Sequence, residues 1–426
     1  MPDSTQAVIG APRPESGSGD SGSTRARNFR LLWIGESTSQ VGSSVSEVVL
    51  PIIGIKVLHA GPLVITSLFT LAWAPWLMFG LPAGVWVDRL RKRRLMIVCD
   101  LVSLLLFSSV AVAALLGVLT VAQLLVVALL GGIVSVFFKA AFQAYIPTLL
   151  GADELMAGNA KLQGGTSFAQ VSGPSLGGVI GQFLGVAVGV LVNAASFAVS
   201  ALCLSKIRSD EPSESKVANR DFRREIGEGL RFLIHDPYLR PLVIFSSMVN
   251  LGISGIDSLM VIFIVRTVGV SPSWAGAILA SMGVGALFGS AISARLVRRF
   301  GSARALFACK VMQASALLVP LTTHGAGLIF GFGWLIVGAG TVAGNVVSLT
   351  FRQSRCPARM RGRVSASHTT MTYSSLAVGA ALAGGLASLV GVRPALWVMA
   401  TVLALASLVL FFSPIRRLRD LPEPAE

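Results

Sequence analysis

Long apolar segments recur along almost the whole chain, and each is long enough to cross a lipid bilayer. A spanning helix needs about 20 mostly apolar residues. The composition, 53% hydrophobic and only 13% charged over 426 residues, excludes a disordered chain and an ordinary soluble domain. The pattern predicts an all-α membrane protein with twelve transmembrane helices, near residues 30–58, 62–87, 95–117, 121–148, 163–186, 188–206, 240–266, 272–296, 304–322, 326–352, 363–390 and 393–413.

Basic residues gather in alternate loops between these segments. One side of the predicted topology carries clusters such as 89–94 and 352–363, and the other carries only Lys56, Arg266 and Arg393. Short basic loops stay on the cytoplasmic side of a membrane. The alternation therefore predicts a multi-pass protein of the plasma membrane with both termini in the cytoplasm, and it explains the net charge of +15 without nucleic-acid binding.

A polar linker at 207–239 divides the apolar segments into two groups of six, at 29–206 and 240–413. Within the linker, apolar residues recur at helical spacing from Phe222 to Leu233, which predicts an amphipathic helix on the inner membrane face. The segment 1–28 is rich in Ser, Gly and Pro, so we expect a disordered cytoplasmic tail, with a second tail at 414–426.

The two groups of helices are related in sequence by one constant shift. The 210-residue shift places Glu47 on Asp257, Lys56 on Arg266 and Pro62 on Pro272. An acid, a base and a proline that coincide under one shift are not easily explained by chance, so we expect two pseudo-symmetric six-helix bundles.

The loop between the second and third predicted helices carries a recognisable motif. Its sequence from Gly84 runs Gly-Val-Trp-Val-Asp-Arg-Leu-Arg-Lys-Arg-Arg, and Gly84, Asp88, Arg89 and Arg93 fit the signature G-x-L-a-D-R-x-G-R-[RK]. The chain here resembles the major facilitator superfamily, although Trp86 and Arg91 depart from the signature. The resemblance implies a gating role for Asp88, through charged hydrogen bonds at a helix end.

A second motif lies in the fifth predicted helix. Gly173, Pro174, Gly177 and Gly178 match the signature G-P-x-x-G-G, which resembles that of the antiporters in the same superfamily. Proline bends a spanning helix, and glycine lets a neighbouring helix approach closely. The whole pattern is most similar to the bacterial branch of macrolide-efflux-like and siderophore-exporter-like proteins, which implies export.

In this superfamily helices 1, 4, 7 and 10 line the substrate cavity, between the bundles and near the membrane midplane. Each of these helices here carries a polar stripe, and polar residues in a spanning helix turn toward protein or water. The alternative is that the uncharged members only form hydrogen bonds between helices. Our candidates for the cavity are Gln40, Ser43, Lys139, Gln143, Asn250, Ser254 and Asn345.

The acids within these helices are the candidates for proton coupling. A cation beside a carboxylate favours its ionised form. We therefore expect Glu36 to pair with Lys139 in a structural or substrate-orienting role, and Asp257 and Glu47 to carry protons. In the alternative, Glu36 releases its proton when substrate competes for Lys139.

Other charged and aromatic residues have simpler expected roles. We expect Asp100 to partner the basic loop at 89–94, and Lys56 and Arg266 to lie at the outer surface without a role in transport. Trp73 and Trp76 are expected to face lipid or to pack against neighbouring helices.

The sequence offers no site for catalysis. It contains no Gly-Lys dipeptide of a P-loop, no His-Glu-x-x-His, and no cysteine or histidine spacing typical of a metal. We therefore expect no enzymatic activity, cofactor or metal, and predict a monomeric, proton-coupled exporter of a small amphipathic compound. The alternatives are an importer or uniporter of the same fold, or a non-transporting membrane sensor or scaffold.

Overall fold

The structure is a computed structural model, which describes residues 18–88, 90–150, 154–207, 222–322, 327–356 and 361–420. The described residues contain helices and no strand. The N-terminal bundle comprises α1 (Ser18–Lys56), α2 (Pro62–Asp88), α3 (Lys92–Leu115), α4 (Val121–Leu149), α5 (Leu155–Phe183) and α6 (Val186–Lys206). The C-terminal bundle comprises α8 (Leu239–Ile262) with its π-helical extension η1 (Phe263–Val268), α9 (Pro272–Phe300), α10 (Ser302–Val311) with the 3₁₀ segment η2 (Met312–Leu318), α11 (Gly327–Arg355), α12 (Arg361–Val390) and α13 (Val392–Phe411).

Nine helices of the described part are long and apolar enough to cross a membrane, namely α2, α3, α4, α6, α8 with η1, α9, α11, α12 and α13. Helices α1 and α5, and α10 with η2, pack within the bundles but do not meet this criterion. The charged stripe of α1, the many glycine and polar residues of α5, and the short length of α10 account for this difference.

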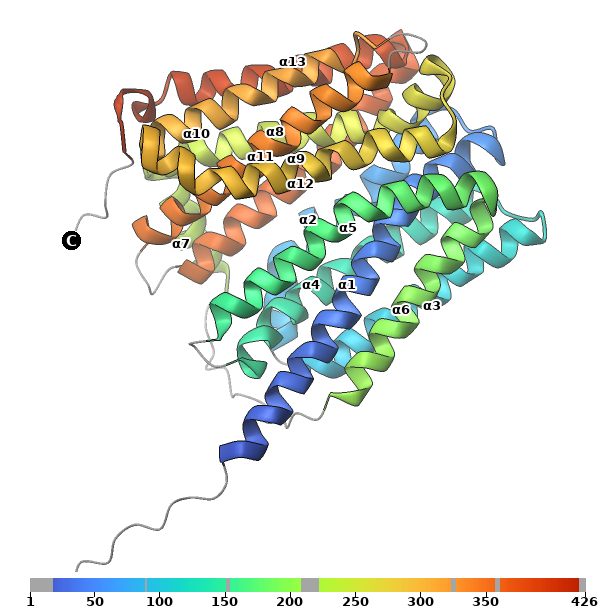
Figure 1. Ribbon diagram of the computed structural model, residues 1–426, viewed down its shortest axis with the longest axis horizontal. Coiled ribbons are helices and arrows are strands. Elements are labelled where there is room, and N and C mark those ends of the chain that lie inside the picture. Colours follow the sequence, from blue (N-terminus) through green and yellow to red (C-terminus); the bar gives the residue numbers. More distant parts are fainter. Residues whose placement is uncertain are drawn as a thin grey trace, which may run out of the picture.

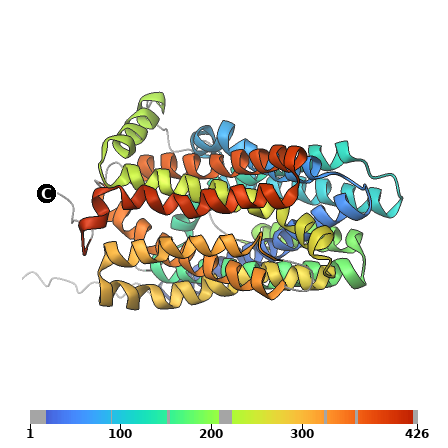
Figure 2. The same cartoon turned by 90° about the horizontal axis from the view of Figure 1, so that it is seen from above.

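The long helices of both bundles run along one common direction (Figure 2). One end of the molecule carries the α2–α3 loop, α7 (Phe222–His235) and the short C-terminal segment η4 (Pro414–Arg417), and we call it the basic end. The other end, which carries the α1–α2, α5–α6 and α8–α9 loops, is the opposite end. Figure 1 shows that the bundles meet near the opposite end and diverge toward the basic end.

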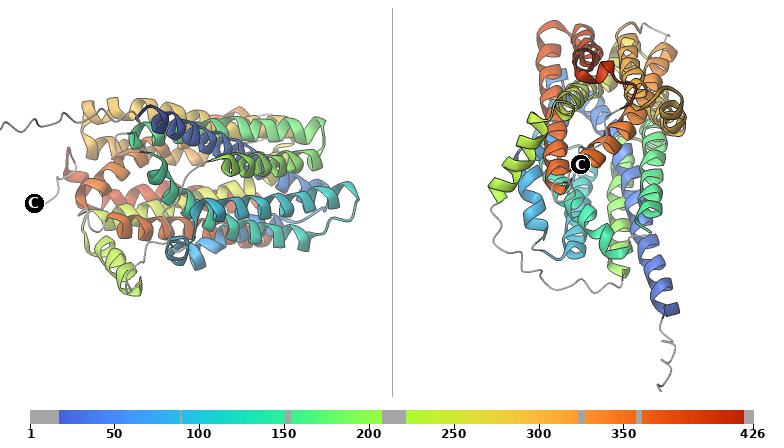
Figure 3. Two further views of the ribbon diagram at one scale, coloured as in Figure 1. Left: turned by 90° about the horizontal axis from the view of Figure 1, so that it is seen from below. Right: turned by 90° about the vertical axis from the view of Figure 1, so that its left-hand side faces the viewer.

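Helix α7 projects from the molecule at the basic end and contacts the C-terminal bundle through α12 (Figure 3). Arg363 of α12 donates a hydrogen bond to Glu228 of α7 at 2.7 Å. The next turn is fixed by Asp236, which accepts the backbone N–H groups at the start of α8 and pairs with Arg355 at 2.7 Å. These charged contacts hold α7 against the C-terminal bundle.

The repeat is visible in the helix boundaries. The starts of α2 and α3 are related to those of α9 and α10 by the shift that the sequence predicts, whereas a slightly smaller shift relates α4, α5 and α6 to α11, α12 and α13. The same junction recurs in both halves: Gly185 before α6 has φ 86° and Gly391 before α13 has φ 92°. Glycine adopts such angles without the clash that a Cβ causes, so each pair of helices is joined with almost no intervening chain.

Two boundary predictions differ from the structure. Helix α1 begins at Ser18, so it extends into the segment 1–28 that the sequence analysis assigned to a tail. Helix α5 begins at Leu155 rather than near residue 163. Both extensions are polar, and polarity indicates where a helix leaves the apolar layer rather than where the helix itself ends.

Hydrogen bonds join the two bundles at the opposite end. Arg266 of η1 donates to the carbonyl oxygen of Ala60 at 3.2 Å, and the N–H of Ser273 donates to Gln182 Oε1 at 3.1 Å. Ile52 belongs to the same buried core as the C-terminal helices. Arg266 is exposed, as expected, and it also links the bundles.

Candidate functional site

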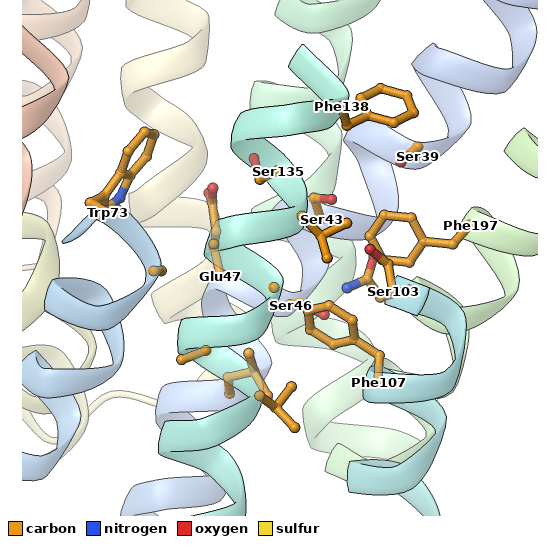
Figure 4. A pocket seen from close by; sticks show the side chains of 18 of the residues that line it. Ser39, Ser43, Ser46, Glu47, Trp73, Ser103, Phe107, Ser135, Phe138 and Phe197 are labelled. Atoms are coloured by element: carbon orange, nitrogen blue, oxygen red, sulfur yellow. The ribbon is translucent and has the colours of Figure 1, made fainter. Parts of the chain in front are cut away.

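A pocket of about 300 Å³ lies on the inner side of the N-terminal bundle, between α1, α2, α3, α4 and α6 (Figure 4). Its polar lining is Glu36, Ser39, Gln40, Ser43, Ser46, Glu47, Asp100, Ser103, Ser135, Lys139 and Asn193. Its aromatic lining is Phe69, Trp73, Trp76, Phe107, Phe138 and Phe197. Three predicted cavity residues, Gln40, Ser43 and Lys139, thus share one pocket with the predicted acids Glu36 and Glu47.

The mouth of the pocket is formed by Glu47, Trp73 and Lys139. The side chain of Glu47 is exposed although it lies far along α1. The Lys139 ammonium lies 5.8 Å from the ring centroids of both Trp73 and Tyr373, a distance at which cation and ring attract one another. Because Tyr373 belongs to α12, the C-terminal bundle contacts two of the residues that form the mouth.

Trp76 is buried and packs edge-on against Tyr373, with the ring centroids 4.7 Å apart. This bears out the expectation that it packs against a neighbouring helix. Trp73 also packs against Tyr373, and both tryptophans line the pocket as well. The two tryptophans therefore take part in the contact between α2 and α12.

The deep end of the pocket is formed by Glu36, Asp100, Ser103 and Asn193. Asp100 lies about 12 Å along α3, at about 1.5 Å per residue, and both Asp100 and Asn193 are only 1% exposed. The side chain of Asp100 lies beside the hydroxyl group of Ser200 on α6. The expectation that Asp100 partners the basic loop is therefore wrong for the part of the loop that the structure describes: Asp100 turns into the bundle, since α6 offers a hydroxyl there.

Glu36 does not form the expected ion pair with Lys139. Its Oε1 accepts a hydrogen bond from Gln40 at 2.7 Å, while the Lys139 ammonium lies over aromatic rings. Lys139 nevertheless acts electrostatically on both Glu36 and Glu47. The premise that Glu47 has no cation nearby is therefore also wrong. For Asp257 the same premise holds, because the charge that acts on Asp257 is that of Glu47.

The candidates on the C-terminal bundle do not line this pocket. Asn250 donates to the carbonyl oxygen of Thr372 at 2.9 Å, and Ser254 donates to that of Leu376 at 2.7 Å. Both bonds join α8 to α12, as the alternative of hydrogen bonding between helices predicts. Asn345 and Gln143 are exposed, so they are free of the packing that fixes Asn250 and Ser254.

The gating motif is described only in part. Arg89 and the side chain of Asp88 lie outside the described residues. A Cβ atom added to Gly84 would have no other atom within 4 Å, so nothing packs closely against this glycine. Arg93 donates to the carbonyl oxygens of Leu204 and Ser205, at the last turn of α6. A guanidinium at a helix C-terminus satisfies carbonyl groups that have no partner within the helix.

The glycines of the antiporter motif hold α5 against two neighbours. A Cβ on Gly173 would lie 2.3 Å from Ser44 Cβ, and one on Gly177 would lie 2.8 Å from the carbonyl oxygen of Val45, both on α1. On the other face of α5, a Cβ on Gly276 of α9 would lie 2.4 Å from the carbonyl oxygen of Pro174. The motif therefore occupies a seam where the two bundles touch.

The sequence analysis missed the four phenylalanines of the pocket lining, Tyr373 beside the pocket, and a buried lysine of the C-terminal bundle. Lys310 of α10 is 1% exposed, with its ammonium 4.6 Å from the ring centroid of Phe245 and 3.5 Å from Asn345 Oδ1. The 210-residue shift, which places Lys310 on Asp100, was the signal that could have found it. Tyr373 carries no comparable signal, because only the packing of α12 on α2 brings it to the mouth.

Comparisons with known proteins agree with this architecture. The profile of the transmembrane secretion effector family matches residues 21–424. The multidrug efflux pump Tap of Mycolicibacterium fortuitum is 27% identical over 93% of this chain and 98% of its own. The enterobactin exporter EntS of Shigella boydii is 23% identical over 85% of each chain.

Among solved structures, a bacterial homologue of the iron transporter ferroportin, in an inward-facing state, superposes with a TM-score of 0.70 and 16% identity. The match covers 91% of this chain and 98% of that one, and it shows a shared fold. The molecule is thus a multi-pass membrane transporter rather than an enzyme, and the chain belongs to the transmembrane secretion effector family of the major facilitator superfamily.

Proposed function

We propose that this transporter exports a small amphipathic compound from the cytoplasm in exchange for protons. The observation that carries the proposal is the pocket, whose aromatic walls and polar groups suit an amphipathic ligand. Glu47, on α1 of one bundle, also interacts with Asp257, on α8 of the other. Because the two acids belong to different bundles, the repulsion between their charges changes when the bundles move. Protonation of the acids is thereby coupled to the relative position of the bundles.

The relatives support the direction of transport. Tap is named an efflux pump and EntS an exporter. In the proposed orientation the basic end faces the cytoplasm, because Arg91, Lys92, Arg93 and Arg94 lie there. The contacts at the opposite end then close the molecule to the outside, and a monomer suffices because the pocket lies within one chain.

The direction is tested in inside-out vesicles that contain the purified, reconstituted protein and a panel of fluorescent amphipathic compounds. We expect at least one compound to accumulate when the lumen is acidified, and the accumulation to collapse when an ionophore removes the pH gradient. Vesicles without protein are the control. Equilibration without accumulation in either gradient direction would identify a uniporter instead.

The orientation is tested separately with single cysteines in a background that lacks Cys99, Cys203, Cys309 and Cys356. Gly61 and Arg91 are both exposed, at the opposite end and the basic end respectively. In intact cells an impermeant thiol reagent should label Gly61→Cys and spare Arg91→Cys, while both should react after permeabilisation. The reverse pattern would place the basic end outside the cell.

A further inference from the structure

We propose that the deep end of the pocket binds a small inorganic cation through oxygen atoms of Glu36 and Asp100. This site goes beyond the exported compound and the proton. It lies at one end of the proposed substrate pocket, and its occupancy can be measured without transport.

The first observation is that the deep end holds polar atoms with no partner. Glu36 Oε2 and Asp100 Oδ2 are both buried and form no hydrogen bond. Both residues line the pocket. Burying a carboxylate away from water is costly unless an opposite charge or hydrogen bonds compensate for it, so these oxygens require a bound partner.

The two carboxylates lie at the same level of the bundle. A Cβ on Gly35, the residue before Glu36, would lie 3.3 Å from Ser200 Cα, and Ser200 is the residue whose hydroxyl group lies beside Asp100. Glu36 and Asp100 also act on one another electrostatically. Two like charges in one buried site repel, and a cation between them removes that repulsion.

In the described part of the chain, no basic side chain forms an ion pair with Glu36 or Asp100. The Lys139 ammonium lies over the rings of Trp73 and Tyr373 at the mouth. The described residues contain no other basic side chain in the pocket lining. The net charge of Glu36, Asp100 and Lys139 is negative, which favours a monovalent or divalent cation from solution.

The C-terminal bundle shows how the equivalent space is filled there. The shift that relates α3 to α10 places Lys310 on Asp100 and Gln313 on Ser103. The smaller shift that relates α4 to α11 places Thr341 on Ser135.

In the C-terminal bundle, Gln313 and Thr341 form a hydrogen bond of 2.8 Å, and the buried Lys310 supplies an ammonium. The N-terminal bundle has two serines instead, whose smaller side chains leave the pocket between them. It also has an acid in place of the lysine. In the N-terminal bundle, a cation from solution would therefore occupy the place that the Lys310 ammonium group occupies in the C-terminal bundle.

The available ligands are all oxygen atoms, which suits a hard cation such as Na⁺ or Ca²⁺. The two carboxylates are joined by the hydroxyl of Ser103, which lies one turn along α3 from Asp100. In the described part of the chain no three His, Cys, Asp or Glu side chains gather, so this is not a site of the zinc type. The stacked rings of Phe107 and Phe197, 5.6 Å apart, lie beside it.

The experiment uses the purified full-length protein in detergent, in choline buffer free of sodium and calcium. NaCl or CaCl₂ replaces choline chloride at constant ionic strength, and tryptophan fluorescence is recorded together with the midpoint of thermal unfolding. Trp73 and Trp76 line the pocket and report on it. We expect one of the two salts to give a saturable signal and a higher midpoint, which identifies the ion.

Variants assign the signal to the deep end. Asp100→Asn and Glu36→Gln should each weaken binding by about tenfold or more, because each removes a charged ligand. Asp257→Asn removes a buried acid from the other bundle and should leave the cation affinity unchanged. Lys139→Gln should tighten binding, because it removes a repelling charge, and misfolding cannot imitate a gain in affinity.

Several results would overturn the proposal. The first is that neither salt gives a saturable response. The second is that the wild type and both acid variants bind the cation with equal affinity. The third is a response to acidification that neither salt reduces. The last result would assign the acid pair to protons alone. None of these outcomes decides whether the protein exports its ligand, because transport is not measured.

Discussion

Gly276→Leu is expected to lower the rate of transport by about tenfold or more, because it forces apart the two bundles at the seam between α9 and α5. Even a Cβ at Gly276 would lie 2.4 Å from the carbonyl oxygen of Pro174 and 3.1 Å from Gly178 Cα. Both are backbone atoms, which cannot turn aside as a flexible side chain can. Small residues are what allow membrane helices to pack this closely, so the larger side chain must displace one whole helix.

The measurement is initial uptake in inside-out vesicles, normalised to the amount of folded protein by size-exclusion chromatography. Gly164→Ala on α5 is the matched control, since no atom lies within 4 Å of the added Cβ. Gly177→Leu tests the other face of α5, where the added side chain would meet α1 of the same bundle. This variant should lower the stability of the N-terminal bundle more than it lowers the rate of transport. Wild-type rates in folded Gly276→Leu would show that this seam does not move during transport.

Asp257→Asn is expected to abolish proton-driven accumulation while leaving downhill flux of the ligand. Of the three acids proposed for proton coupling, Asp257 is the one on which an acid and no cation acts. The amide has the same size as the carboxyl group but cannot bind and release a proton at this position. Movement of the ligand is therefore no longer coupled to movement of a proton. Glu47→Gln should weaken coupling in the same direction, although Lys139 acts on Glu47 as well.

The readout is the number of protons that purified protein releases when the ligand binds in weakly buffered solution. Asp257→Asn should reduce this number to near zero, and Glu36→Gln should retain it. If Glu36→Gln alone abolished release, the proton would belong to Glu36, in competition with substrate for Lys139. Unchanged release in all variants would leave a uniporter as the better account.

Much of the fold could be predicted from sequence, because a bilayer restricts spanning chains to helices that satisfy their own backbone hydrogen bonds. The apolar segments predict most helices within a few residues, and the spacing from Phe222 to Leu233 predicts α7. For the repeat, the sequence predicts one constant shift, but the second half of each bundle follows a smaller one. Loops tolerate such changes in length without affecting helix packing.

The site was harder to predict because it depends on which helix faces meet. Asp100 is close in sequence to the basic loop, yet α3 directs it toward Ser200 of α6. Gly35 and Gly42 bring α1 against α6, which sets Glu36 at the level of Asp100. A polar stripe indicates that a helix face avoids lipid but not which neighbour it meets, so the pocket was expected between the bundles and lies largely within one.

The hydrogen bond from Arg266 to Ala60 O determines how firmly the molecule rests in one state. A charged donor to a backbone carbonyl contributes about 1.5–3 kcal/mol when buried and less when exposed, and Arg266 is exposed. About 1.4 kcal/mol changes a population tenfold. The bond by itself can therefore bias the resting equilibrium about tenfold without locking it, in addition to the buried contacts between the bundles.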